Sequence, residues 1–161
     1  MTTKGDYTDE EWATLVRAPI VAGMAISIAD PGGPIETTKE VMATLRAVTD
    51  PGTGAELVTN VSEEVKALTE RRANPAGDFR PKGTMAGQQV LDELGKVNDI
   101  LSAKATPEEA GAFRSWLMAV AQQAADAAKE GGFMGFGATQ VSEGEQEMLG
   151  RLSRTLGVTS P

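Results

Sequence analysis

Apolar residues recur along this chain three and four positions apart, which is the spacing of one face of an α-helix. The clearest run follows Pro107 and places Phe113, Leu117, Val120 and Ala124 on one face. No stretch of four to eight residues alternates apolar and polar side chains as a half-buried strand does. We therefore expect an all-α bundle of six to seven helices, over residues 8–29, 35–49, 53–72, 84–103, 107–130 and 142–157.

Local signals mark the ends of these helices. Asp50-Pro51-Gly52 is expected to stop the second helix, and Gly157 the last. Pro19 lies inside the first helix, where its missing N–H predicts a kink or a split. Four helices are expected to begin with a capping box, a Ser or Thr followed three residues later by Glu. The pairs are Thr8 with Glu11, Thr53 with Glu56, Thr106 with Glu109, and Ser142 with Glu145.

The chain is expected to be one domain built from two similar halves. Its 161 residues suit a single core, and residues 74–83, rich in Pro and Gly, form a loop that joins halves 1–73 and 84–161. In each half an apolar helix ends in an acid and glycines, as Asp30-Pro31-Gly32-Gly33 and as Glu130-Gly131-Gly132. We expect the halves to be pseudo-symmetric helical hairpins.

Charge narrows the range of partners. The 15 Lys and Arg residues stand against 23 Asp and Glu residues, so the net charge is −8. Such a protein repels phosphate backbones and anionic lipid, which argues against a nucleic acid. The longest apolar stretch, residues 18–29, is short for a bilayer span, and the first residues lack a signal pattern. We expect a cytoplasmic chain without direct membrane insertion and with a protein partner, and the sequence also leaves room for a homodimer.

The absence of both Cys and His restricts the chemistry. Thiolate catalysis, disulfides and thiolate metal sites are excluded, and the commonest general base is missing. A metal site would have to be built from oxygen, which favours calcium, magnesium or manganese. We expect no enzymatic activity, and carboxylate-assisted hydrolysis around Glu130 with a metal is the remaining enzymatic alternative.

The acidic corners resemble a known family. Glu130-Gly131 followed by Val141-Ser142-Glu143-Gly144-Glu145, and more loosely Asp30-Pro31-Gly32 followed by Ile35-Glu36 and Glu40, are similar to the signature of the tellurite-resistance TerB family. The resemblance covers about half of the chain. It implies a duplicated all-helical fold whose acidic turns bind a divalent metal, acting in a cytosolic stress response near a membrane-associated complex. Pro31 and the lengthened second turn depart from the pattern.

Six acids are therefore candidate metal ligands. Carboxylates at the end of one helix and the start of the next can converge on a cation. The other reading is that acids at 36, 143 and 145 stabilise helix N-termini, because the positive end of the helix dipole attracts them. The candidates are Asp30, Glu36 and Glu40 in the first corner, and Glu130, Glu143 and Glu145 in the second.

Two non-enzymatic functions remain open. The first is a stress-response binding module that senses a divalent cation through these corners. The second is a structural or adaptor protein that docks a protein partner through loops 74–83 and 131–138. In the second loop, Phe133, Met134 and Phe136 would either cover the core or present an apolar patch.

Overall fold

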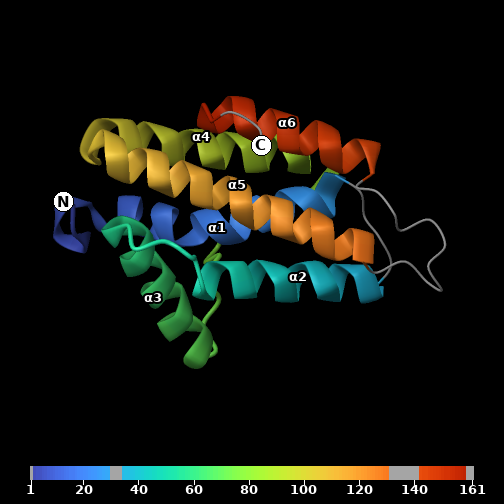
Figure 1. Cartoon of the computed structure of the whole chain (residues 1–161), viewed down its shortest axis with the longest axis horizontal. Coiled ribbons are helices and arrows are strands. Elements are labelled where there is room, and N and C mark those ends of the chain that lie inside the picture. Colours follow the sequence, from blue (N-terminus) through green and yellow to red (C-terminus); the bar gives the residue numbers. More distant parts are fainter. Residues whose placement is uncertain (1, 30–33, 131–141, 159–161) are drawn as a thin grey trace.

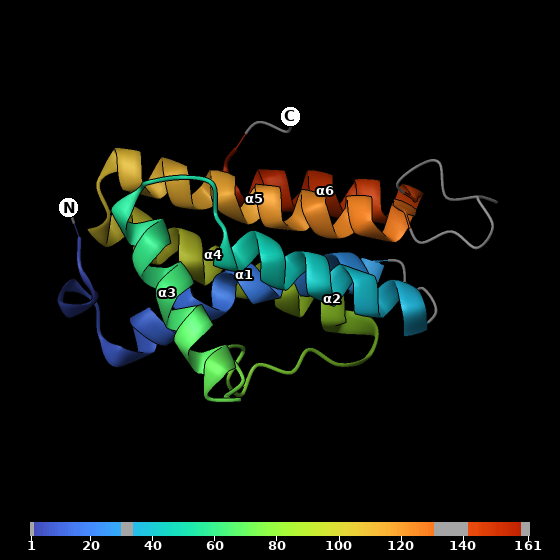
Figure 2. The same cartoon turned by 60° about the horizontal axis from the view of Figure 1, so that its bottom comes forward.

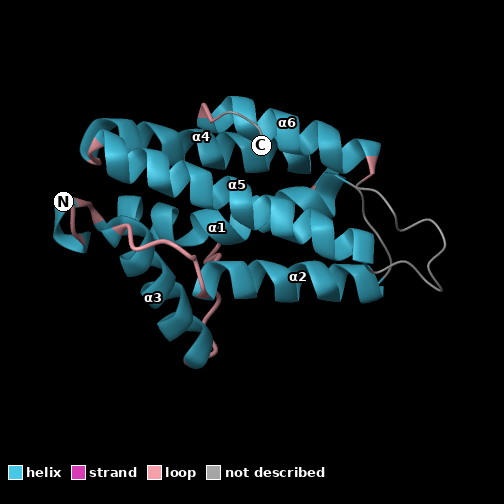
Figure 3. Ribbon diagram, in the orientation of Figure 1, coloured by secondary structure: helices cyan, strands magenta, loops and turns pink. Residues whose placement is uncertain are grey.

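The structure is a computed structural model that describes residues 2–29, 34–130 and 142–158, and for 34–38 and 128–130 only the course of the backbone. Within these ranges the chain forms six α-helices and no strand, which confirms the predicted all-α bundle (Figure 3). Two short 3-10 helices, η1 (Lys4–Asp6) and η2 (Gly83–Met85), accompany them. The helices are α1 (Asp9–Ala29), α2 (Pro34–Thr49), α3 (Glu56–Glu70), α4 (Ala86–Lys104), α5 (Pro107–Glu130) and α6 (Glu143–Leu156).

Capping boxes start three of the four helices for which they were predicted. At α1 the backbone N–H of Glu11 donates to Thr8 Oγ1 (3.1 Å), and the N–H of Thr8 donates to the Glu11 carboxylate (2.8 Å). Each bond satisfies an N–H that the helix itself leaves unpaired. The same reciprocal pair forms between Thr106 and Glu109 and between Ser142 and Glu145.

Two other local predictions need correction. The box at Thr53 is wrong, because α3 begins at Glu56 with Ala55 as its N-cap, and Thr53 Oγ1 instead accepts a hydrogen bond from the Ala55 N–H (3.3 Å). Ala55 has an extended ψ of 123°, so Thr53 stands before the helix and not at its cap. Of the two outcomes predicted for Pro19, the split is wrong, since α1 runs unbroken from Asp9 to Ala29, and the kink stays a prediction. Packing on both sides of the proline outweighs the one lost hydrogen bond.

Helix α1 is the centre of the bundle. It packs against each of the other five α-helices, and its Leu15, Val21 and Ile26 are completely buried. Each such side chain contributes roughly 1.5–3 kcal/mol by leaving water. Helix α2 packs most extensively against α5, and α1 packs most extensively against α4 (Figures 1 and 2). Helices of residues 1–73 thus share one core with helices of 84–161, while the pseudo-symmetry of the halves stays a prediction.

By length and composition, α1 is also apolar enough to cross a bilayer. Just over half (56%) of its most apolar 18-residue stretch is buried inside the bundle, as in the core helix of a soluble protein. Helix α1 is longer than the uninterrupted apolar stretch 18–29, because it begins at Asp9 and includes Trp12, Leu15 and Val16.

The C-terminal end of α2 is tied to two neighbouring helices. Pro51 has no N–H, so the carbonyl of Ala47 lacks the donor that a continuing helix would supply. Trp116 Nε1 of α5 donates to that carbonyl instead (3.3 Å). The next carbonyl, of Val48, accepts from Ser62 Oγ of α3 at 2.6 Å. Side chains from α3 and α5 therefore complete the hydrogen bonding where α2 stops.

Candidate functional site

The helix ends that flank the predicted acidic corners lie at one end of the bundle. Figures 1 and 2 show that α1 ends, α2 begins, α5 ends and α6 begins there. Asp30 lies outside the described residues, and the structure describes only the backbone at Glu36 and Glu130. Of the six candidate ligands, three therefore have described side chains, namely Glu40, Glu143 and Glu145.

Those three acids occupy different environments. Glu40 is 2% exposed in α2, and its carboxylate accepts a hydrogen bond from the Ser27 hydroxyl of α1. Glu145 is also buried, and its carboxylate accepts from the Ser142 N–H (3.0 Å) as a helix cap. Glu143 is exposed. Among the described side chains no three acids lie close enough together to hold a metal ion, so the metal site stays a prediction.

A larger feature lies elsewhere, between α1, α2 and the connection formed by residues 74–82, which we call the 74–82 segment. These parts enclose a partly open groove of about 590 Å³. None of the three candidate metal ligands with described side chains lines it. Its lining residues are Ile20, Gly23, Met24, Ser27, Ile28, Val41, Thr44, Leu45, Asn74, Pro75, Phe79, Arg80, Pro81 and Lys82.

The floor of the groove is the seam between α1 and α2. Gly23 has no side chain, and Thr44 lies directly against it: a Cβ added to Gly23 would stand 2.5 Å from Thr44 Oγ1 and 2.6 Å from its Cγ2. This close approach leaves no room between the two helices. The groove therefore lies above the seam, with the 74–82 segment as its other wall.

An apolar line along α1 forms one side of the groove. Ile20, Met24 and Ile28 are four residues apart, so they share one face of the helix. Eight residues separate the first from the last, and at 1.5 Å per residue the line is about 12 Å long. Phe79 of the opposite wall is itself partly buried against the core. An apolar side chain thus faces this line from the 74–82 segment.

Two turns shape the 74–82 segment. The N–H of Gly77 donates to the carbonyl of Asn74 (3.0 Å), and the N–H of Phe79 donates to the carbonyl of Ala76 (3.2 Å). The side-chain oxygen of Asn74 accepts from the Ala76 N–H at 2.9 Å, and Gly77 has a φ of 59°, which favours glycine. Ala76 is buried, so the turns hold the segment against the bundle.

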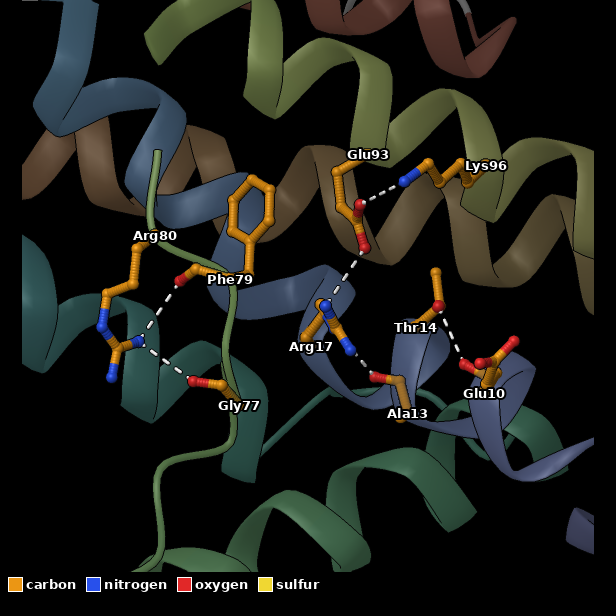
Figure 4. A network of polar contacts seen from close by, with 9 residues as sticks. All are labelled: Glu10, Ala13, Thr14, Arg17, Gly77, Phe79, Arg80, Glu93 and Lys96. Carbon is orange, nitrogen blue, oxygen red and sulfur yellow. Dashed lines mark hydrogen bonds and ion pairs between the residues drawn. The ribbon is translucent and has the colours of Figure 1, made fainter. Parts of the chain in front are cut away.

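Two cations, Arg80 and Lys82, belong to the lining, and none of its described residues is an acid. Arg80 Nη1 donates to the carbonyls of Gly77 (3.0 Å) and Phe79 (3.3 Å), and Figure 4 shows the guanidinium folded back onto its own segment. The Gln89 side chain accepts from the Lys82 N–H (3.1 Å) and donates to the Lys82 carbonyl (3.4 Å). In the described part of the chain, neither cation makes a salt bridge. Local hydrogen bonds therefore hold the guanidinium of Arg80 and the backbone of Lys82.

A second, polar hollow of about 450 Å³ shares Phe79 and Arg80 with the groove. Its buried acid is Glu93 of α4, whose carboxylate lies 3.6 Å from Arg17 Nη1 and 3.3 Å from Lys96 Nζ (Figure 4). Burying a carboxylate is costly unless it is paired, and these two cations supply the pairing. The network joins α1 to α4 and accounts for the burial of Glu93.

The sequence analysis missed the groove, although two signals pointed to it. The line Ile20, Met24, Ile28 lies beside the residues that pack into the core, so α1 is apolar around most of its surface and needs cover on that side. Phe79 is an aromatic residue in a loop rich in Pro and Gly. The predicted docking loop 74–83 does border the groove, whereas loop 131–138 lies outside the described residues.

Comparison with models of protein families, with curated proteins and with solved structures finds no match. The resemblance to the TerB family therefore stays a prediction from short motifs. Function has to be argued from the geometry of the groove and of the acidic corners.

Proposed function

We propose that this protein is a non-enzymatic binding module that holds the apolar part of its ligand or partner in the groove between α1, α2 and the 74–82 segment. The observation that carries this proposal is the size and lining of the groove. Its volume of about 590 Å³ falls within the range of roughly 300–1,000 Å³ that is usual for ligand sites, and such sites are mostly apolar with a few polar groups.

The apolar surface around the groove supports the proposal. Val41, which lines the groove, is 49% exposed, and its neighbour Met42 is 55% exposed. Covering apolar surface stabilises a complex by roughly 25 cal/mol per Å² before the costs of association are subtracted. Met24 also suits a binding surface, because its unbranched side chain adapts to different shapes.

An uncharged dye tests the proposal without assuming a particular ligand. Nile red fluorescence should rise and saturate when the full chain is added. Replacement of Met24 by Trp fills the groove and should weaken the dye's Kd at least tenfold. The control is Met85→Trp, the same exchange at an exposed residue outside the lining. Equal binding by all three proteins would show that the dye does not occupy the groove and would contradict the proposal.

Cation sensing is the second candidate, favoured by the position of the four helix ends that flank the acidic corners (Figure 1). Calorimetric titration with calcium, magnesium and manganese, repeated on Asp30→Asn and Glu130→Gln, tests it. Saturable binding that is weakened in either variant supports a sensor. Absence of binding by all three ions removes the candidate and leaves the groove proposal untouched.

A further inference from the structure

The charge of the groove differs from the charge of the whole chain. Acids outnumber bases by 23 to 15 over the sequence, yet the described residues that line the groove include two bases and no acid. We propose, on the basis of the binding function above, that the groove binds a straight-chain anionic amphiphile, of which a fatty acid is the simplest. The alkyl chain lies along Ile20, Met24 and Ile28, and the carboxylate lies at Arg80 and Lys82.

The length of the apolar line suits an alkyl chain. The apolar line of Ile20, Met24 and Ile28 runs along the groove for about 12 Å. With C–C bonds of about 1.5 Å in a zigzag, a chain of roughly ten carbons spans the length.

The cationic residues are arranged to receive the head group. The Arg80 guanidinium already donates to two carbonyls of its own segment, so binding orders it little further. Its Nε and second amino group have no partner in the described residues, and they can donate to a carboxylate.

The buried acid next to the groove sets the orientation of the ligand. The Ser27 hydroxyl, which lines the groove, donates to the Glu40 carboxylate behind it. Because the single O–H of Ser27 is donated to Glu40, this residue offers no donor to an anionic head group. Among the described lining residues, Arg80 and Lys82 are the two that attract a negative charge, so the head group binds there.

The first test is a chain-length series with the full chain. Sodium octanoate, decanoate, dodecanoate and tetradecanoate are titrated calorimetrically below their micelle concentrations. Each methylene that enters the groove should tighten the Kd about fourfold, which corresponds to about 0.8 kcal/mol. The gain should level off beyond about ten carbons, when the groove is filled. Absence of saturable binding by all four carboxylates would overturn the proposal.

The second test concerns the head group. Dodecanoate is compared with dodecanol and with dodecyltrimethylammonium, and binding is repeated on Lys82→Glu. The matched control is Lys66→Glu, which makes the same charge change at an exposed residue of α3 outside the lining. We expect dodecanoate to bind at least tenfold more tightly than either analogue, and Lys82→Glu to lose that preference while Lys66→Glu keeps it.

The outcomes separate this inference from the function on which it rests. If the three head groups bind equally, or if both variants behave alike, the proposal of an anionic ligand is wrong. Saturable binding of Nile red would in that case still support the apolar groove as a binding site. If neither the dye nor any alkyl compound binds, both proposals fail. An acidic amphipathic peptide that binds while dodecanoate does not would identify a protein partner and overturn the amphiphile.

Discussion

Thr44 of α2 occupies the space that a side chain on Gly23 of α1 would need, with its Oγ1 only 2.5 Å from the position of a Cβ there. Because the Thr44 Cβ itself would be only 3.1 Å away, rotation of the side chain does not remove the clash. The absence of one side chain thus sets the distance between the two helices that form the floor of the groove.

Replacement of Gly23 by Ala should therefore force α1 and α2 apart. We expect the free energy of unfolding, measured with urea, to fall by about 1–3 kcal/mol. Gly95→Ala is the control, because a Cβ there meets nothing within 4 Å and Ala is favoured over Gly inside a helix by roughly 0.5–1 kcal/mol. The second change Thr44→Ala should restore part of the loss. A Gly23→Ala protein as stable as the parent would contradict this account of the seam.

Replacement of a tryptophan by Phe should destabilise the protein more at position 116 than at position 12. Trp116→Phe leaves the Ala47 carbonyl without its donor, and an unsatisfied buried group costs about 1–3 kcal/mol. Trp12 Nε1 is buried without a hydrogen-bond partner in the described residues, so Trp12→Phe removes no such bond. Both changes remove similar apolar area. Chemical denaturation should show the larger loss for Trp116→Phe, and equal losses would argue that the bond to Ala47 contributes nothing.

The two cations beside Glu93 should contribute unequally. Glu93→Gln leaves Arg17, whose side chain is 23% exposed, without its buried partner, and we expect a loss of about 1–3 kcal/mol, limited by water that reaches the guanidinium. Lys96 is 69% exposed, so Lys96→Ala should change the free energy of unfolding by at most about 0.5 kcal/mol. Urea unfolding of both variants measures this. An equal loss in the two would show that the pairing with Lys96, and not with Arg17, supports the buried acid.

Glu109 should make stability depend on acidity. Burial by itself would raise the pKa of Glu109, but hydrogen bonds from the Thr2 N–H (2.8 Å), the Thr106 N–H (3.1 Å) and the Thr2 hydroxyl (3.0 Å) together lower it below its ordinary 4.5. A lowered folded-state pKa gives a stabilisation that is present above 4.5 and is lost as the pH falls through the folded value. The parent should therefore be more stable than Glu109→Gln above pH 4.5, and this difference in stability should shrink as the pH falls through the folded-state pKa.

Thermal unfolding of both proteins as a function of pH measures the difference. The variant is its own control for every other titrating group, because only residue 109 changes. A constant gap between the two melting curves from neutral to strongly acidic pH would mean that the carboxylate of Glu109 contributes no pH-dependent stability.

Local signals in the sequence proved reliable where the interaction itself is local. The boxes at Thr8, Thr106 and Ser142 form because both partners lie within one turn of backbone, and Pro51 ends α2 because it has no N–H to donate. The box at Thr53 fails although its spacing is the same. Spacing alone does not determine the backbone angles between the two residues.

The candidate site could not be predicted from the sequence, for a different reason. Phe79 and Arg80 are more than fifty residues from the α1 line in sequence, and no periodicity relates them to it. Glu40 was predicted as a metal ligand at the first corner, and tertiary packing buries it against Ser27. The proposed roles of the acidic corners, of the resemblance to the TerB family and of a protein partner stay predictions.

The amino-acid sequence by itself determined that this chain is helical, which faces of its helices are apolar and where most of them begin and end, because propensity, periodicity and capping act over a few residues. Only the tertiary structure decided that α1 lies at the centre, that Gly23 meets Thr44, and that residues 74–82 form an apolar groove with two cations in its wall. Those features depend on contacts between residues far apart in sequence, and such contacts exist only once the helices have packed.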